Sequence, residues 1–207
     1  MMTKILFWFQ VIMAWIYIIP QVIHLINGKT AGLNLAIWSL FIGYLLVGLS
    51  LSILSYREKP EPIRRYTVII FAQWAVFLPV LLIIGFQHIH WTVGDTIVSS
   101  SALVLYGIVL LRYRSFKDEM SRGWLAVLCK GIPQLWVAWT MIQANSSEWL
   151  PPLSLLATNM TMLPRFFQVY WQGQQGGWDR ATKGLMLGET ANVVTWLVVT
   201  AVWFFLR

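Results

Sequence analysis

The chain alternates long apolar segments with short polar intervals. Each apolar segment holds about 20 residues, the length that an α-helix needs to cross a bilayer, and the intervals are too short for a separate soluble domain. The pattern therefore predicts an all-α membrane protein with seven transmembrane helices. They cover approximately residues 5–26, 33–55, 63–86, 93–112, 124–143, 149–171 and 185–206.

A proline–glutamine pair occurs in two of these segments. Pro20-Gln21 lies in the first segment and Pro133-Gln134 in the fifth. A proline inside a helix removes one backbone hydrogen bond and kinks the helix. Glutamine carries donors and acceptors that lipid cannot satisfy, so each glutamine is expected to face a cavity or another helix. The pairs predict two hinges or gates in equivalent halves of the chain.

The repeated pair divides the seven helices into three, one and three. A single connecting helix restores the orientation of the chain, so the two triplets are expected to be parallel repeats related by an axis along the membrane normal. The expected parts are a first three-helix repeat (1–92), a linker helix (93–118) and a second three-helix repeat (119–207).

Composition agrees with a membrane protein. Hydrophobic residues make up 58% of the 207 residues and charged residues 11%, whereas charged residues make up roughly 25% of a soluble domain. The net charge of +7 comes mostly from residues between apolar segments, where they orient a protein in its bilayer. We therefore expect contact with a lipid bilayer and not with nucleic acid.

Basic residues gather on one side of the expected bundle. Lys29 and Arg207 belong to the other side, and two further basic residues lie inside helices. Cytoplasmic loops are enriched in lysine and arginine, which predicts a multi-pass protein with a cytoplasmic N-terminus. The eleven residues of the basic side are Lys4, Arg57, Lys59, Arg64, Arg65, Arg112, Arg114, Lys117, Arg122, Arg180 and Lys183.

Three charged residues fall inside predicted helices: Lys130, Arg165 and Glu189. At about 1.5 Å per residue, each lies roughly 6–9 Å in from the basic side. Charges inside a bilayer need partners or water, so we expect Glu189 to pair with Arg165 or Lys130. The three residues are compatible with a gate, or with a site for a charged solute group in which Glu189 accepts a proton. The alternatives are a structural ion pair, or long side chains of Lys130 and Arg165 that extend to the membrane interface.

Amides and tryptophans supply the candidate binding residues. Gln73 and Asn192 occupy matching places in the third helix of each triplet, and Asn159 lies in the sixth helix. Binding sites of transporters built from repeats lie near the bilayer midplane, where amides can bind hydroxyl, amino or carboxylate groups. Trp74 and Trp196 lie deep enough to line such a pocket. Interhelical hydrogen bonding for the amides and packing for the tryptophans are the alternatives.

The chain resembles the PQ-loop family, which contains the SWEET and SemiSWEET sugar transporters, cystinosin and the lysosomal cationic amino acid exporters. The resemblance rests on the two proline–glutamine pairs, the polar turn from Gly28 to Asn34 and the seven predicted helices, and it covers nearly the whole chain. It implies a transporter. Residues 163–192 are also similar to the branch that includes the mannose-P-dolichol utilization defect protein.

Two functions follow from this resemblance. The first is a membrane transporter of a small polar solute that works by alternating access, with proton coupling left open. The tryptophan that SWEET transporters usually carry late in the second helix of each triplet is absent from 43–48 and 160–164, which favours amino acids or related solutes over sugars. The second is a non-transporting receptor or assistance factor in lipid-linked sugar handling, suggested by residues 163–192.

An enzyme is not expected. The sequence presents no nucleophile–base pair, no metal-ligand cluster and no phosphate-binding glycine loop. We accordingly expect neither a cofactor nor a metal, and the sequence leaves open whether the protein is a homo-oligomer.

Overall fold

The computed structural model describes residues 2–58, 62–115 and 117–207, so Lys59 of the basic side lies outside the described residues. Within these ranges α5, η1 and α6 follow one another without a break, and we call them together the α5–α6 rod. The rod and six further helices account for the seven expected helical segments. The elements are α1 (Met2–Ile26), α2 (Ala36–Glu58), α3 (Pro62–His88), α4 (Val93–Tyr113), α5 (Glu119–Ala126), the π-helical turn η1 (Val127–Gly131), α6 (Ile132–Ala144), α7 (Pro152–Gly176) and α8 (Arg180–Phe205).

Six of the seven segments are long and apolar enough to cross a membrane: α1, α2, α3, α4, the α5–α6 rod and α8. The chain is thus an all-α, multi-pass membrane protein. The exception is α7, which covers the sixth expected segment (149–171) and is less apolar than a spanning helix requires. Arg165, Gln168 and Gln172 lie along α7 and line an internal cavity, so this helix exchanges apolar residues for polar ones on its inner face.

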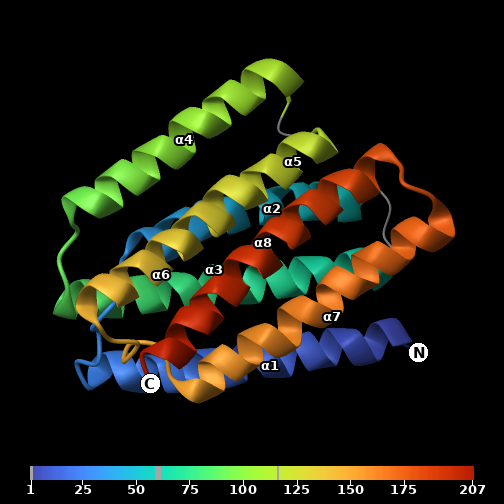
Figure 1. The fold of residues 1–207 in the computed structure, drawn as a ribbon. Helices are drawn as coiled ribbons and strands as arrows, with labels where there is room; N and C mark the ends of the chain where they lie inside the picture. Colours follow the sequence, from blue (N-terminus) through green and yellow to red (C-terminus); the bar gives the residue numbers. More distant parts are fainter. Residues whose placement is uncertain (1, 59–61, 116) are drawn as a thin grey trace.

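Successive helices run in opposite directions, which brings the basic intervals together at one end of the bundle (Figure 1). The start of α1 lies at the same end as the starts of α5 and α8 (Figure 1). Lys4, Arg122 and Arg180 belong to this end. We call it the basic end, and we call the opposite end, where the α1–α2 and α6–α7 turns lie, the sealed end.

The helices form two groups with the same internal packing. In the first group, α3 packs against both α1 and α2, and in the second group α8 packs against both the rod and α7. The groups meet along two seams, α1 against α7 and α2 against η1 and α6. The remaining helix, α4, packs against α2, α5, η1 and α6, so it lies over the second seam.

Aspartates fix the start of three helices. Asp118 and Asp179 are the N-caps of α5 and α8, and the carboxylate of each accepts a backbone N–H of the first turn. Thr92 and Asp95 form a capping box at the start of α4. The buried Asp95 also accepts the N–H of Ala36 at 3.2 Å, which attaches the start of α2 to α4.

Glycines allow α5 and α8 to approach closely at the basic end. A Cβ added to Gly184 would lie 2.2 Å from the carbonyl oxygen of Glu119, and one added to Gly123 would lie 2.4 Å from the carbonyl oxygen of Gly184. Small residues at such positions let helix backbones touch. The two helices therefore form one closely packed unit.

Three helices extend about five residues further at the basic end than the apolar pattern predicts. The rod starts at Glu119 and α8 at Arg180, because the N-cap residues Asp118 and Asp179 begin these helices before the apolar run. The third helix, α7, continues through polar residues to Gly176. The expected depth of the three in-helix charges is corrected accordingly. They lie nine to eleven residues, or about 14–16 Å at 1.5 Å per residue, from these helix ends.

Candidate functional site: a cavity between the two helix groups

A cavity of about 550 Å³ lies between the two helix groups. Its walls come from α1, α2 and α3 on one side and from the rod, α7 and α8 on the other. Ligand pockets of proteins commonly have volumes of about 300–1,000 Å³, so this cavity has room for a small solute. It lies where motion of one group relative to the other would reshape it.

The cavity opens at the basic end. Its lining residues Arg122 and Gln172 are exposed and Glu119 is half-exposed, and all three lie near the ends of their helices at that end. Toward the sealed end the lining residues Trp38 and Trp196 are buried, with exposed fractions of 1% and 4%. Water therefore reaches the cavity from the basic end, and aromatic rings close its floor.

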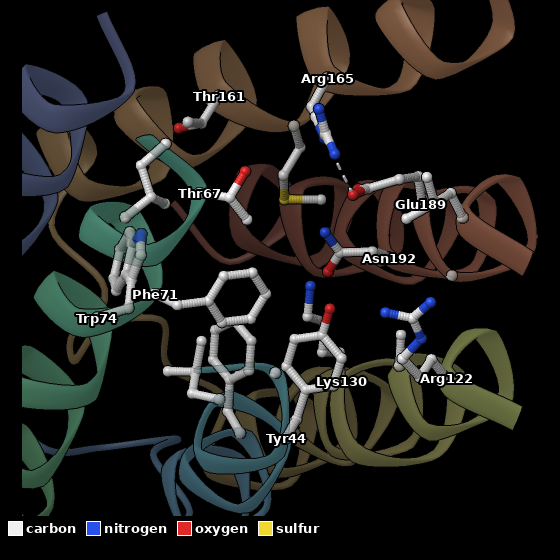
Figure 2. A pocket seen from close by; sticks show the side chains of 18 of the residues that line it. Tyr44, Thr67, Phe71, Trp74, Arg122, Lys130, Thr161, Arg165, Glu189 and Asn192 are labelled. Carbon is white, nitrogen blue, oxygen red and sulfur yellow. Dashed lines mark ion pairs between the residues drawn. The ribbon is translucent and has the colours of Figure 1, made fainter. Parts of the chain in front are cut away.

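An ion pair forms one wall. Arg165 Nε on α7 lies 3.5 Å from Glu189 Oε1 on α8, and Arg165 also donates to Gln168 Oε1 at 3.1 Å. Figure 2 shows both side chains pointing toward the cavity from neighbouring helices. The pairing of Glu189 with Arg165 expected from the sequence is confirmed.

Lys130 faces this pair from the opposite wall (Figure 2). Its Nζ lies 4.3 Å from the ring centroid of Tyr44 and 5.2 Å from that of Phe41, both on α2. Aromatic faces attract cations. Within the described part of the chain, Lys130 forms no ion pair with a carboxylate, so its charge is held by rings alone.

The backbone at Lys130 is a π-helical turn, a feature that is rare and frequent at functional sites. Pro133 follows two residues after the turn and has no N–H to donate to the carbonyl of Cys129, four residues earlier. The turn is closed instead by the N–H of Ile132, which bonds the carbonyl of Val127. The second proline–glutamine pair thus lies directly beside the turn that carries Lys130.

Gln134 orients Asn192 in the cavity wall. The Nε2 of Gln134 donates to Asn192 Oδ1 at 2.9 Å, and the hydroxyl of Thr195 donates to Gln134 Oε1. The Oδ1 of Asn192 is therefore occupied, whereas its Nδ2 has no acceptor among the described residues. Figure 2 places the Asn192 amide between the Arg165–Glu189 pair and Lys130.

The rest of the wall is aromatic and weakly polar. Phe71 and Trp74 of α3 lie at the side of the cavity away from the ion pair, with Thr67 and Thr161 above them (Figure 2). Such a surface suits the carbon skeleton of a solute whose polar groups are bound elsewhere.

Hydrogen bonds between the two groups hold the sealed end. Gln21 Nε2 on α1 donates to the carbonyl of Trp149 at 2.6 Å, and Ser154 Oγ on α7 donates to the carbonyl of Tyr17 at 2.7 Å. Gln21, Trp149 and Ser154 are fully buried. The first proline–glutamine pair therefore takes part in closing this end of the molecule.

The two turns of the sealed end also interlock. Thr140 Oγ1 donates to the carbonyl of Gly32 at 2.8 Å. Gly32 has φ +84°, and a Cβ there would lie 2.5 Å from the carbonyl oxygen of Ser146, so only glycine fits without displacement. The polar turn noted in the sequence thus packs directly against the turn after α6.

At the mouth of the cavity, Asp118 joins α5 to α8. Its Oδ2 lies 2.7 Å from Arg180 NH2. Burial raises the pKa of Asp118, but the N–H of Ser121 and the guanidinium of Arg180 outweigh it, so the pKa lies below its ordinary value of 3.8.

The structure brings most of the sequence-predicted residues to one cavity. Those that line it are Trp74, Lys130, Gln134, Arg165, Glu189, Asn192 and Trp196.

The other predicted residues have different neighbours. Gln73 donates to the carbonyl of Val11 at 3.3 Å, and Asn159 bonds Leu155 and Thr200, so both act between or within helices.

The prolines and Gln21 also lie outside the cavity lining. Pro20 and Pro133 belong to the interiors of α1 and the rod, and Gln21 belongs to the sealed end.

Sequence reasoning missed the aromatic partners of Lys130. Phe41 and Tyr44 are three residues apart, so they share one face of α2. Thr67 and Phe71, four residues apart on α3, share a face in the same way. This spacing could have indicated inward-facing pairs, but nothing in it identifies the helix that they meet.

Comparisons with known protein families, with curated proteins and with solved structures find no match for this chain.

Proposed function

We propose that the protein is a membrane transporter of a small polar solute that works by alternating access, as its resemblance to the PQ-loop family implies. The observation that carries the proposal is the cavity itself. It lies between two helix groups, opens at the basic end and is closed at the other end by hydrogen bonds between the groups. An alternating-access transporter needs a central site that is open to one side at a time.

The packing of the helices supports two parallel repeats. Exchanging α1, α2 and α3 for the rod, α7 and α8 leaves the pattern of contacts unchanged. The third helix of each group packs against the other two, and the first helix of each group meets the second helix of the other. In this proposal α4 is the linker helix, and the repeats rock against one another.

The two proline–glutamine pairs supply the expected hinges. Pro20 lies next to Gln21, which closes the sealed end, and Pro133 follows the π-helical turn of the rod. A π-helical turn and a helix-interior proline both weaken the regular hydrogen-bond ladder. Bending at these two places would open one end while closing the other.

Counterflow uptake into proteoliposomes tests the proposal. The panel contains labelled amino acids, sugars and small organic acids, each with and without an inward proton gradient. Thr161→Trp places an indole in the cavity and is expected to abolish uptake, since Thr161 lines it. Leu111→Trp, at a 79% exposed position of α4, adds the same side chain outside the cavity and is expected to leave uptake intact.

Saturable uptake that Thr161→Trp abolishes and Leu111→Trp spares is the expected result. If every solute stays outside while thermal unfolding shows folded protein, the transporter proposal is wrong, and a non-transporting receptor becomes the better explanation.

A further inference from the structure

We infer that the solute is an anion, and that its carboxylate or phosphate group binds Lys130 Nζ, with Asn192 Nδ2 as a further donor of the same cavity. This inference rests on the proposed function because it names the substrate class of the same cavity. Four observations carry it: the charge balance of the lining, the environment of Lys130, the orientation of Asn192 and the character of the remaining wall.

Among the described residues, the lining carries one positive charge in excess. Its ionisable pairs are Arg165 with Glu189, at 3.5 Å, and Arg122 with Glu119, at 3.6 Å. Each pair is neutral as a whole. Lys130 is the fifth charged residue of the lining, and within the described chain no carboxylate balances it. A solute with a negative charge would neutralise the cavity.

The rings of Phe41 and Tyr44 position the Lys130 ammonium without neutralising it. A cation over an aromatic face is attracted by the quadrupole of the ring and keeps its full charge. An ammonium has three N–H donors, and the described chain offers none of them an oxygen acceptor. These donors are available to an oxyanion, and hydrogen bonds between charged groups are stronger than neutral ones.

Asn192 adds a second donor to the same cavity. Gln134 occupies Asn192 Oδ1 at 2.9 Å, and Thr195 occupies Gln134 Oε1. The Thr195 hydroxyl also lies 2.7 Å from the Ala191 carbonyl, and with Gln134 donating to Oδ1 the Nδ2 end of the Asn192 amide remains for the cavity. The exposed atom is the donor Nδ2, which suits an oxyanion and not an ammonium group. Figure 2 shows the amide of Asn192 between Lys130 and the Arg165–Glu189 pair, with its oxygen toward Lys130 and its nitrogen toward the pair.

The remaining wall suits an organic anion. Phe71 and Trp74 offer ring faces, and Thr67 and Thr161 lie on the same side of the cavity. An inorganic ion would leave this surface without a partner. The cavity therefore matches an organic acid or a phosphorylated small molecule with a carbon skeleton.

Binding of matched acid and neutral compounds tests the inference. The purified full chain is titrated in detergent with succinate against succinamide, lactate against lactamide, and glucose 6-phosphate against glucose. Binding is measured by calorimetry, and thermal unfolding monitors folding. We expect at least one acid to bind, and its neutral counterpart to bind more weakly by about tenfold or more, as for the loss of a charged hydrogen bond. Binding of a carboxylate would identify a site for organic acids, and binding of glucose 6-phosphate would identify a site for phosphorylated small molecules.

Three variants assign the binding to Lys130. Lys130→Gln is expected to weaken acid binding by about tenfold or more, and Lys130→Arg is expected to retain most of it. Lys183→Gln is the matched control, because it removes a cation from the exposed start of α8 outside the cavity lining. It should leave acid binding unchanged.

Asn192→Asp provides an independent test. It replaces the donor with a carboxylate of the same shape and should weaken acid binding without weakening that of the neutral compound.

The outcomes separate this inference from the proposed function. Acid binding that depends on Lys130, without counterflow, would support the anion site and contradict the transporter. Counterflow of neutral solutes that survives Lys130→Gln would support the transporter and overturn the anion site. Equal binding of an acid and its amide, unchanged in Lys130→Gln, would also overturn it.

Discussion

Arg165 and Glu189 form their ion pair within one helix group, because Arg165 lies on α7 and Glu189 on α8. The pair lines the cavity and does not bridge to α1, α2 or α3. It therefore belongs to the wall of one helix group. Lys130, by contrast, lies on the second group and contacts rings of the first, so its contacts span the two groups.

Removing both members of the Arg165–Glu189 pair is expected to cost less than the sum of the two single changes. Arg165→Gln and Glu189→Gln each leave one charge in the cavity wall without its partner, whereas the double variant leaves none. Because the arginine is partly exposed, the coupling should be about 0.5–1 kcal/mol. Thermal unfolding of wild type, the two single variants and the double variant measures this coupling. Strictly additive effects would mean that the pair stabilises nothing.

Gln21→Leu is expected to loosen the sealed end. The variant loses the buried bond to the Trp149 carbonyl and leaves that carbonyl without a side-chain donor, which costs about 1–3 kcal/mol. Leu25→Cys reports opening, since Leu25 is fully buried near this end. Thiol labelling in a Cys129→Ala background should become faster with Gln21→Leu. Thr200→Val, which breaks a bond between α7 and α8 of one group, should leave the labelling rate unchanged.

Pro133→Ala is expected to slow transport while sparing binding. Alanine supplies the N–H that the Cys129 carbonyl lacks and favours a regular helix over the π-helical turn. A straighter rod should be more stable and should bend less readily. Counterflow turnover would fall, and the affinity measured by calorimetry would change little. Unchanged turnover would count against a hinge at this position.

Gly184→Ala is expected to destabilise the protein by about 1–3 kcal/mol, the usual cost of overpacking. The added methyl group meets the backbone of Glu119, which cannot move aside without separating α5 from α8. Gly107→Ala is the matched control, because a Cβ on this α4 residue meets nothing within 4 Å. It should be neutral or slightly stabilising. Equal unfolding temperatures for the two variants would show that the close approach is not required.

Stability is expected to fall in acid through Asp118. Its pKa is lower in the folded protein than the ordinary 3.8, so its contribution is present above about pH 4 and is lost as the pH falls toward the lowered value. Thermal unfolding between pH 7 and pH 3 should show wild type more stable than Asp118→Asn at neutral pH, with the difference disappearing in acid. Arg180→Gln should reduce the same difference. Parallel profiles for wild type and Asp118→Asn would contradict this account.

The sequence predicts the helices well because apolar length is a local property. It misplaces the basic ends of the rod, α7 and α8, where polar residues prolong the helix beyond the apolar run. N-cap residues Asp118 and Asp179 mark two of these starts, and local chemistry could have identified both.

The site is harder to predict because it depends on which helices face one another. The ion pair of Arg165 with Glu189 can be predicted from the sequence, because a charge inside the membrane requires a partner. The aromatic faces beneath Lys130 come from α2, and sequence spacing does not reveal that contact. Gln73 and Asn159 show the opposite problem. Their amides match binding chemistry, but packing directs them to Val11 and Thr200.

The buried Gln21 Oε1 has no hydrogen-bond partner among the described residues, whereas both ends of the Gln134 amide are bonded. If the repeats exchange environments, Gln21 would meet Gln73 as Gln134 now meets Asn192, and the vacant acceptor would receive a donor. Gln134 would then donate to the turn between α1 and α2, as Gln21 now donates to the carbonyl of Trp149. In the proposed transport cycle, the contacts that each half makes in this structure would therefore be those that the other half makes in the next conformation.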